Sequence, residues 1–183
     1  MAYETKKYVE YDFTADLEEK LPGRGLWLTP CADIVSRAGA ENVFSKAALR
    51  NVTVPCNLSE QLVLLLGRRC MDLIALARRS GCAVAGFEKV IKALAGGDVA
   101  VLVEAIDGAD DGKNKIARKA TGIHALSLWT AGQLGAPFGR DRVVHVAITS
   151  GGLAKSLLRD GRRLEGLQGK GVYADARVEL QGS

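Results

Sequence analysis

Residues 99–106, VAVLVEAI, form an almost unbroken apolar run that contains three valines. A run without alternation of polar and apolar residues is typical of a strand that is buried on both faces of a sheet. Such a strand needs other elements to cover each face. The segment therefore favours a layered fold in which helices lie on both sides of a central sheet.

The segments around this run alternate between helical and strand patterns. Apolar residues at helical spacing predict helices over 59–80, 88–95, 113–122 and 152–166, with Gly67 breaking or kinking the first of them. Short apolar segments predict further strands over 82–86, 124–129 and 143–148. We therefore expect an α/β fold, a three-layer α/β/α sandwich with a central mixed sheet. Ser59 and Ser150 are the expected N-caps of the first and last helices.

The charge is distributed unevenly along the chain. Hydrophobic residues make up 48% and charged residues 25% of the 183 residues, as in ordinary globular proteins. Residues 1–56 carry a net charge of about −1 and residues 57–165 about +5, within a formal total of +4. We therefore divide the chain into a small unit at 1–56, a basic α/β/α domain at 57–165 and a Gly-rich tail at 166–183. The tail segment VYADARVEL has the composition of a short strand, but a mobile end is the default expectation.

Several classes of protein are not supported by the residues. The four cysteines form no CxxC pair, and the two histidines lie in apolar segments, so we expect no metal and no cofactor. No apolar run approaches the length of a membrane span, and the first residues lack a signal-peptide pattern. The segment 108–114, GADDGKN, is too short between its glycines for a phosphate-binding loop. We therefore expect a cytoplasmic protein that is not an enzyme.

The junction at Gly86 and Phe87 is the first candidate binding site. It lies between a predicted strand and a predicted helix, where free backbone amides face a ligand. Arg78 and Arg79 end the preceding helix, and cations at Lys89 and Lys92 follow. Two interpretations are equally open: a phosphate site, or a simple turn among solvated charges.

The stretch ALARRSGCAVAGFEKVIKALAGGDVAVLVEAIDG at 75–108 resembles the ribosomal kink-turn-binding superfamily, the L-seven-Ae type ribosomal proteins and their bacterial relatives. The resemblance extends over about 58–160 and implies an α/β/α sandwich that binds bends in RNA. Gly86 matches the motif glycine, Phe87 the next position and Lys92 the motif lysine. Glu88 and Lys89 stand where the family has asparagine and glutamate, the side chains that read sheared G·A pairs. Residues 133–135, QLG, resemble a late loop of the family.

The segment LPGRGLWLTP at 21–30 displays Arg24 between two glycines ahead of a strand at 26–28. A helical segment at 31–49 follows, with Arg37 and Lys46. Residues 10–55 resemble the bacterial YlxR family of nucleic-acid-binding proteins, a small α+β unit, although its opening R-x-C-I segment has no counterpart here. The resemblance implies that Arg24, Gly25 and Arg37 contact RNA. A YlxR unit followed by a kink-turn-binder unit is a known bacterial arrangement.

The leading hypothesis is a non-catalytic protein that binds structured RNA, ribosomal or another non-coding RNA, near ribosome or transcription-complex proteins. The RNA-binding residues would be Arg24, Gly25, Arg37, Arg78, Arg79, Gly86, Phe87, Glu88, Lys89 and Lys92. An adaptor that docks a protein on the same sandwich is the alternative, and an enzyme acting on a nucleotide is a weaker third. The basic helix around Lys113 and Lys119 is either a solvated face or a further RNA contact.

Overall fold

The computed structural model describes residues 15–17 and 26–170, together with the backbone of 178–180. Its main sheet has four strands in the order β2 (Ala83–Ala85), β5 (His145–Thr149), β3 (Val99–Ala105) and β4 (His124–Trp129). Strand β5 runs antiparallel to both β2 and β3, whereas β3 and β4 are parallel. The sheet is therefore mixed.

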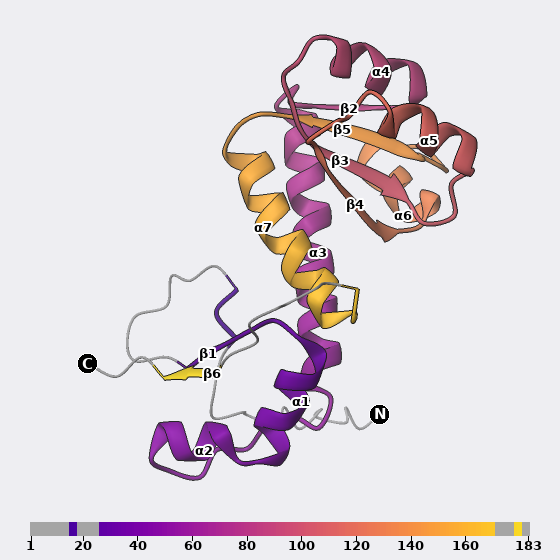
Figure 1. Cartoon of the computed structure of the whole chain (residues 1–183). Coiled ribbons are helices and arrows are strands. Elements are labelled where there is room, and N and C mark those ends of the chain that lie inside the picture. Colours follow the sequence, from indigo (N-terminus) through magenta and orange to yellow (C-terminus); the bar gives the residue numbers. More distant parts are fainter. Residues whose placement is uncertain (1–14, 18–25, 171–177, 181–183) are drawn as a thin grey trace, which may run out of the picture.

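Helices cover both faces of this sheet (Figure 1). One face packs against α4 (Phe87–Ala95) and α5 (Asp110–Ala117). The other packs against α3 (Leu58–Arg79), α6 (Ala131–Gly135), the 3₁₀ turn η1 (Ala136–Phe138) and α7 (Gly152–Leu167). The predicted α/β/α sandwich with a central mixed sheet is confirmed.

The β3 strand supplies side chains to both layers, as its continuous apolar run predicts. Val101 and Val103 lie in the core beneath α3 and α7, whereas Leu102 faces α4 and α5. The register shifts between Val99 and Val101 along β5, and Val99 packs with Leu102 rather than with Val101. An irregularity of this kind turns the strand end toward the other layer.

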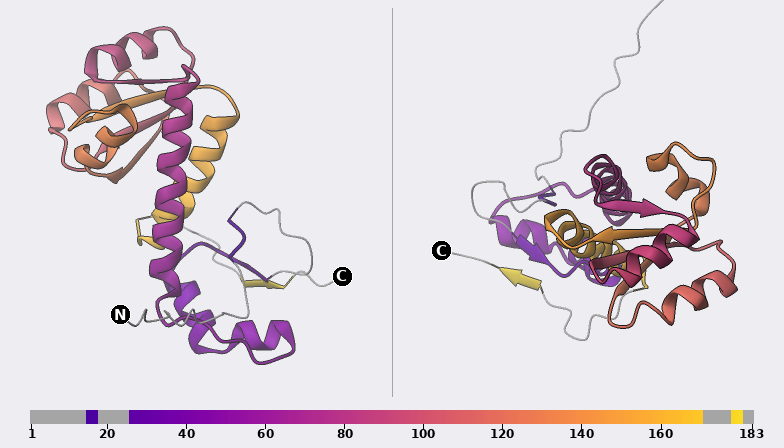
Figure 2. Two further views of the ribbon diagram at one scale, coloured as in Figure 1. Left: turned by 180° about the vertical axis from the view of Figure 1, so that it is seen from behind. Right: turned by 90° about the horizontal axis from the view of Figure 1, so that it is seen from above.

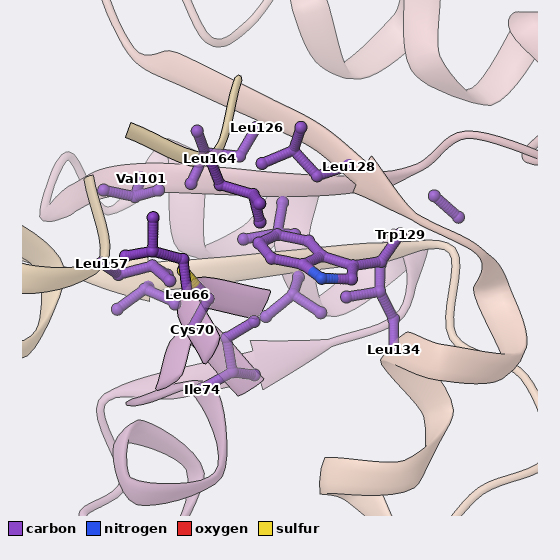
Figure 3. Close-up of a cluster of buried hydrophobic side chains, with 14 of the residues drawn as sticks. Leu66, Cys70, Ile74, Val101, Leu126, Leu128, Trp129, Leu134, Leu157 and Leu164 are labelled. Carbon is purple, nitrogen blue, oxygen red and sulfur yellow. The ribbon is translucent and has the colours of Figure 1, made fainter. Parts of the chain in front are cut away.

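The larger of the two cores lies where α3 and α7 pack side by side on the sheet (Figure 3). Apolar side chains from the two helices, two strands and α6 meet there: Leu66, Cys70, Ile74, Val101, Leu126, Leu128, Trp129, Leu134, Leu157 and Leu164. Gly161 of α7 allows the helix to approach closely, because a methyl group there would lie 2.5 Å from Leu126 Cδ1.

A second group of elements lies at the far end of α3 from the sandwich (Figures 1 and 2). It contains β1 (Leu26–Leu28), α1 (Ala32–Ala40), α2 (Val43–Ala48) and β6 (Val178–Leu180). Strands β1 and β6 pair antiparallel, so the end of the chain returns to the group formed by its beginning. Helix α1 packs on α3, where Val35 and Leu58 enter the main core.

Four local expectations were wrong. Gly67 lies inside one continuous 22-residue helix, because a glycine weakens a helix without removing a backbone donor. The helix expected over 31–49 is divided at Asn42, whose φ of 54° is left-handed. Asn57 rather than Ser59 precedes α3, and Gly151 rather than Ser150 precedes α7.

Among the described residues, no helix combines the length and hydrophobicity of a membrane span.

The environment of Cys70 leads to a prediction about thiol reactivity. Burial raises the pKa of this thiol to about 12, and the nearby Asp160 carboxylate adds to the effect. At pH 7 the thiolate fraction is then on the order of 10⁻⁵, so Cys70 is expected not to react in the folded protein. Cys56 is exposed and serves as the internal control. Timed labelling with a thiol reagent, followed by peptide mass spectrometry, should modify Cys56 first and Cys70 only after denaturation. Equal rates in the folded protein would contradict the buried position.

Candidate nucleic-acid interface

Three helices begin at the same edge of the main sheet. Strands β2, β3 and β4 end there and lead into α4, α5 and α6, respectively, because β2 and β3 are both antiparallel to β5 and β3 is parallel to β4. The positive ends of the three helix dipoles therefore lie along one edge. This arrangement suits an anionic ligand.

Gly86 forms the turn from β2 into α4. Its φ of 104° and ψ of 149° lie in a region that side chains strongly disfavour, which explains a glycine at this position. Its amide donates to the His145 carbonyl oxygen over 2.9 Å, which fixes the turn to β5. No side chain caps α4. Within the described residues, the amides of Phe87, Glu88 and Lys89 have no hydrogen-bond acceptor and remain available at the helix start.

The loop between η1 and β5 brings Arg140 to this turn. A methyl group at Gly86 would lie 4.0 Å from Arg140 Nη1, so the guanidinium and the helix start border the same space. Arg78 holds the loop in place: its Nη1 donates to the Pro137 carbonyl oxygen over 2.6 Å, and its guanidinium lies 5.8 Å from the centre of the Phe138 ring. We call Gly86, Phe87, Glu88, Lys89 and Arg140 the Gly86 edge.

His145 and Glu104 are half-buried or buried side chains that lie beneath Phe87, at the base of the Gly86 edge. The Phe87 and His145 rings meet edge to face, with 6.0 Å between their centres. His145 Nδ1 lies 3.3 Å from Glu104 Oε1, and neither atom makes a well-oriented hydrogen bond. A methyl group at Gly112 would lie 3.0 Å from His145 Nε2, so the glycine leaves room for the ring. Close packing of α4, α5 and β5 therefore fixes the position of His145 beneath Phe87.

Asp107 connects the loop after β3 to α6 and to the loop before β5. Its Oδ1 accepts from the Ala131 amide over 2.6 Å, and its Oδ2 accepts from Arg142 Nη2 over 3.1 Å. The Ala131 amide, with Arg142 beside it, holds the pKa of Asp107 below its ordinary value of 3.8. Thr130 and Gln133 close a capping box at the start of α6. These contacts hold the loop that carries Arg140 against the sheet.

The predicted site residues fall into three places. Glu88, Lys89 and Lys92 are exposed on α4, beside Gly86 and Phe87. Arg78 reaches the Pro137 loop, whereas Arg79 is the last residue of α3 and points about 100° away around the helix. Arg37 lies on α1, 3.5 Å from Glu41, at the far end of α3. Arg24 and Gly25 lie outside the described residues. The Gly86 edge and Arg37 are therefore separate surfaces.

Arg140 and Phe138 are the residues that the sequence analysis missed. The signal for them was weak: Gly135, which ends the QLG segment, and Gly139, with a φ of 62°, enclose a tight turn. Neither residue type is unusual in a turn. Only the folded chain shows that this turn lies beside Gly86.

Both lysines within the basic helix α5 bind acceptors of the same chain. Lys115 pairs with Asp111 at 2.6 Å, and Lys113 Nζ donates to the Ile106 carbonyl oxygen. Arg118 and Lys119 lie past its C-terminal end, which is at the opposite edge of the sheet from Gly86. This placement favours a solvated face.

The residues that the structure describes contain no group of three histidine, cysteine or acidic side chains placed to hold a metal ion.

No protein-family model and no curated protein matches the chain. Among solved structures, a protein of unknown function from Bacillus halodurans C is 23% identical over 50% of this chain and 95% of its own length, with a TM-score of 0.47. A 15.5kD RNA binding protein from Giardia lamblia is 16% identical over 56% of this chain and 89% of its own length, with a TM-score of 0.45.

Proposed function

We propose that this protein binds structured RNA through the Gly86 edge and performs no catalysis. The observation that carries the proposal is the approach of Arg140 to the uncapped start of α4 at Gly86. A guanidinium and several unpaired backbone amides bordering one space form a complementary site for a phosphate group. Lys89 and Lys92, three residues apart on the same exposed side of α4, extend the positive surface.

A folded RNA fits this site better than a single strand. The edge offers amides and cations, which bind the phosphate backbone without reading base identity. Aromatic residues make up only 5% of the chain, and Phe138 is buried, so a row of exposed rings for stacking bases is not provided by the described surface. Recognition would then depend on RNA shape and on phosphate positions.

The two families that the sequence resembles give the proposal its finer form. The Gly86 edge would correspond to the RNA-binding helix start of the kink-turn binders. Glu88 and Lys89 replace the residues that read G·A pairs there, so we propose binding to bent or looped RNA without strict kink-turn selectivity. A role near the ribosome or the transcription machinery is part of the same proposal.

Replacing Lys89 and Arg140 together by alanine is expected to weaken RNA binding. Two lost phosphate contacts should lower the affinity at least about tenfold at 0.1 M salt, because each contact releases counterions. The measurement is fluorescence anisotropy with a stem-loop RNA interrupted by an internal loop, using the full chain. Arg24→Ala, tested separately, examines the turn predicted from the YlxR resemblance.

The matched control is the Arg118→Gln and Lys119→Gln double variant, which removes the same two kinds of charge from the other end of α5. It should bind as the unchanged protein does. If the Lys89 and Arg140 variant also binds normally at low salt, the proposed surface is wrong. Binding of a protein partner with no RNA affinity in the unchanged chain would favour the adaptor hypothesis instead.

A further inference from the structure

A second basic surface runs along α3 and α7, away from the Gly86 edge. Its members share exposed or half-exposed positions on the solvent side of this helix pair: Arg68, Arg69, Arg79, Lys155, Arg159, Arg162 and Arg163. We call this set the arginine face. Helices α3 and α7 contact one another along their lengths and lie side by side (Figures 1 and 2).

Helical geometry aligns these residues. On α7, Lys155, Arg159 and Arg163 follow at intervals of four, which places them in one row. On α3, Arg68 and Arg79 are eleven residues apart, close to three full turns, so they point to the same side. Arg69 connects the two rows, because its Nε lies 2.6 Å from the Asp160 carboxylate of α7.

Asp160 organises the centre of the face. Its side chain is 0% exposed, and it binds Arg69 Nε at 2.6 Å and Arg159 Nε at 2.9 Å. Arg163 Nη1 lies 3.6 Å from the same carboxylate. Both short contacts are made by Nε atoms, so they orient the Arg69 and Arg159 guanidinium groups above the buried carboxylate. Arg163 Nη1 also donates to the Leu17 carbonyl oxygen over 3.0 Å, and this acceptor is neutral.

Three cations of this face lie apart from the Asp160 cluster. The buried Asp160 carboxylate contacts Arg69, Arg159 and Arg163. Asp72 is the exposed acid on the α3 side, and it makes no ion pair in the described part of the chain. Arg68, Arg79 and Lys155 are exposed and make no hydrogen bond or ion pair with another described side chain. Fold stability does not account for these three residues, since neighbouring like charges repel one another.

We propose that the arginine face binds the phosphate backbone of the same folded RNA as a second contact surface, an inference that rests on the proposed function. Arginine suits phosphate because its planar fork donates two parallel hydrogen bonds. The row ends at Arg79, about 100° around the end of α3 from Arg78, which holds the loop of the Gly86 edge. A folded RNA that wraps around this end of α3 would contact both the Gly86 edge and the arginine face.

The test measures RNA affinity against salt concentration, with the stem-loop probe described above. The Arg68→Gln and Lys155→Gln double variant is the primary variant, because neither side chain makes a hydrogen bond or ion pair with the described part of the chain. Each lost phosphate contact lowers the slope of log K against log salt by about 0.9, so the slope should fall by about 2. Affinity at 0.1 M salt should fall at least about tenfold.

Three results would overturn this proposal. If the Lys89 and Arg140 variant loses affinity while the Arg68 and Lys155 variant matches the unchanged protein, the face is wrong and the Gly86 edge stands. If the Arg118→Gln and Lys119→Gln control loses as much slope as the primary variant, only net charge is involved. If the unchanged protein binds no RNA but binds phosphatidylserine vesicles, both the proposed function and this face fail, and a membrane surface takes the place of RNA.

Discussion

Asp160→Asn is expected to lower the free energy of unfolding by about 3 kcal/mol. The substitution keeps the size of the side chain but removes the buried charge that Arg69, Arg159 and Arg163 contact where α3 and α7 meet. Removing one partner of a buried ion pair costs roughly 3–5 kcal/mol in other proteins. The lower end applies here because the arginine side chains are 24%, 40% and 22% exposed and regain water.

The effect should be measured by urea unfolding followed by circular dichroism at neutral pH. Asp72→Asn is the matched control, because it removes the same charge from an exposed position on α3 and is expected to change stability by less than about 0.5 kcal/mol. Arg69→Gln should cost less than Asp160→Asn, since Arg159 and Arg163 still pair with the carboxylate. Equal stabilities for the Asp160 and Asp72 variants would show that the buried carboxylate does not hold the two helices together.

The sequence predicted most of the sandwich because its signals are local. The run at 99–106 and the short apolar segment at 124–129 mark buried strands, and the structure places β3 and β4 there. Amphipathic spacing predicted α4 and α7 in the same way. The break expected at Gly67 was wrong because packing of Leu66, Cys70 and Ile74 on the sheet stabilises the helix through that residue.

The candidate sites could be predicted only in part. Gly86 was predicted because a glycine between a strand and a helix has a local conformational meaning, which its φ of 104° confirms. Arg140 and the Asp160 cluster were missed because their partners lie far away in the chain: Arg69 and Asp160 are 91 residues apart. The weak signal for Asp160 was its place in the buried row of α7, between Leu157 and Leu164. Such a row predicts an apolar residue, so an acid there indicates a distant basic partner.

Gly135→Ala is expected to displace the loop that carries Arg140 and to weaken both stability and RNA binding. Gly135 has ordinary helical angles, with φ of −66° and ψ of −40°, so the glycine is needed for space rather than for conformation. A methyl group there would overlap the Arg140 carbonyl oxygen and lie 3.0 Å from the Asp141 carbonyl group. Backbone atoms cannot rotate away as a side chain does, so the whole loop must move.

The displacement has two measurable consequences. Overpacking of this kind costs about 1–3 kcal/mol, and we expect the upper part of that range because the Arg140 amide also donates to the Gly135 carbonyl oxygen over 3.1 Å. RNA affinity should fall about as far as in Arg140→Ala, because the guanidinium no longer reaches Gly86. Urea unfolding and fluorescence anisotropy measure the two effects on the same protein samples.

Gly132→Ala provides the matched control within the same helix. The nearest atom to a methyl group at Gly132 is the Asp141 carbonyl oxygen at 3.9 Å, an ordinary contact. Alanine is favoured over glycine in a helix by about 1 kcal/mol, so this variant should be as stable as the unchanged protein or slightly more stable. It should also bind RNA normally. If Gly135→Ala behaves like Gly132→Ala in both measurements, the contact between α6 and the loop does not position Arg140, and the Gly86 edge loses the support on which its geometry depends.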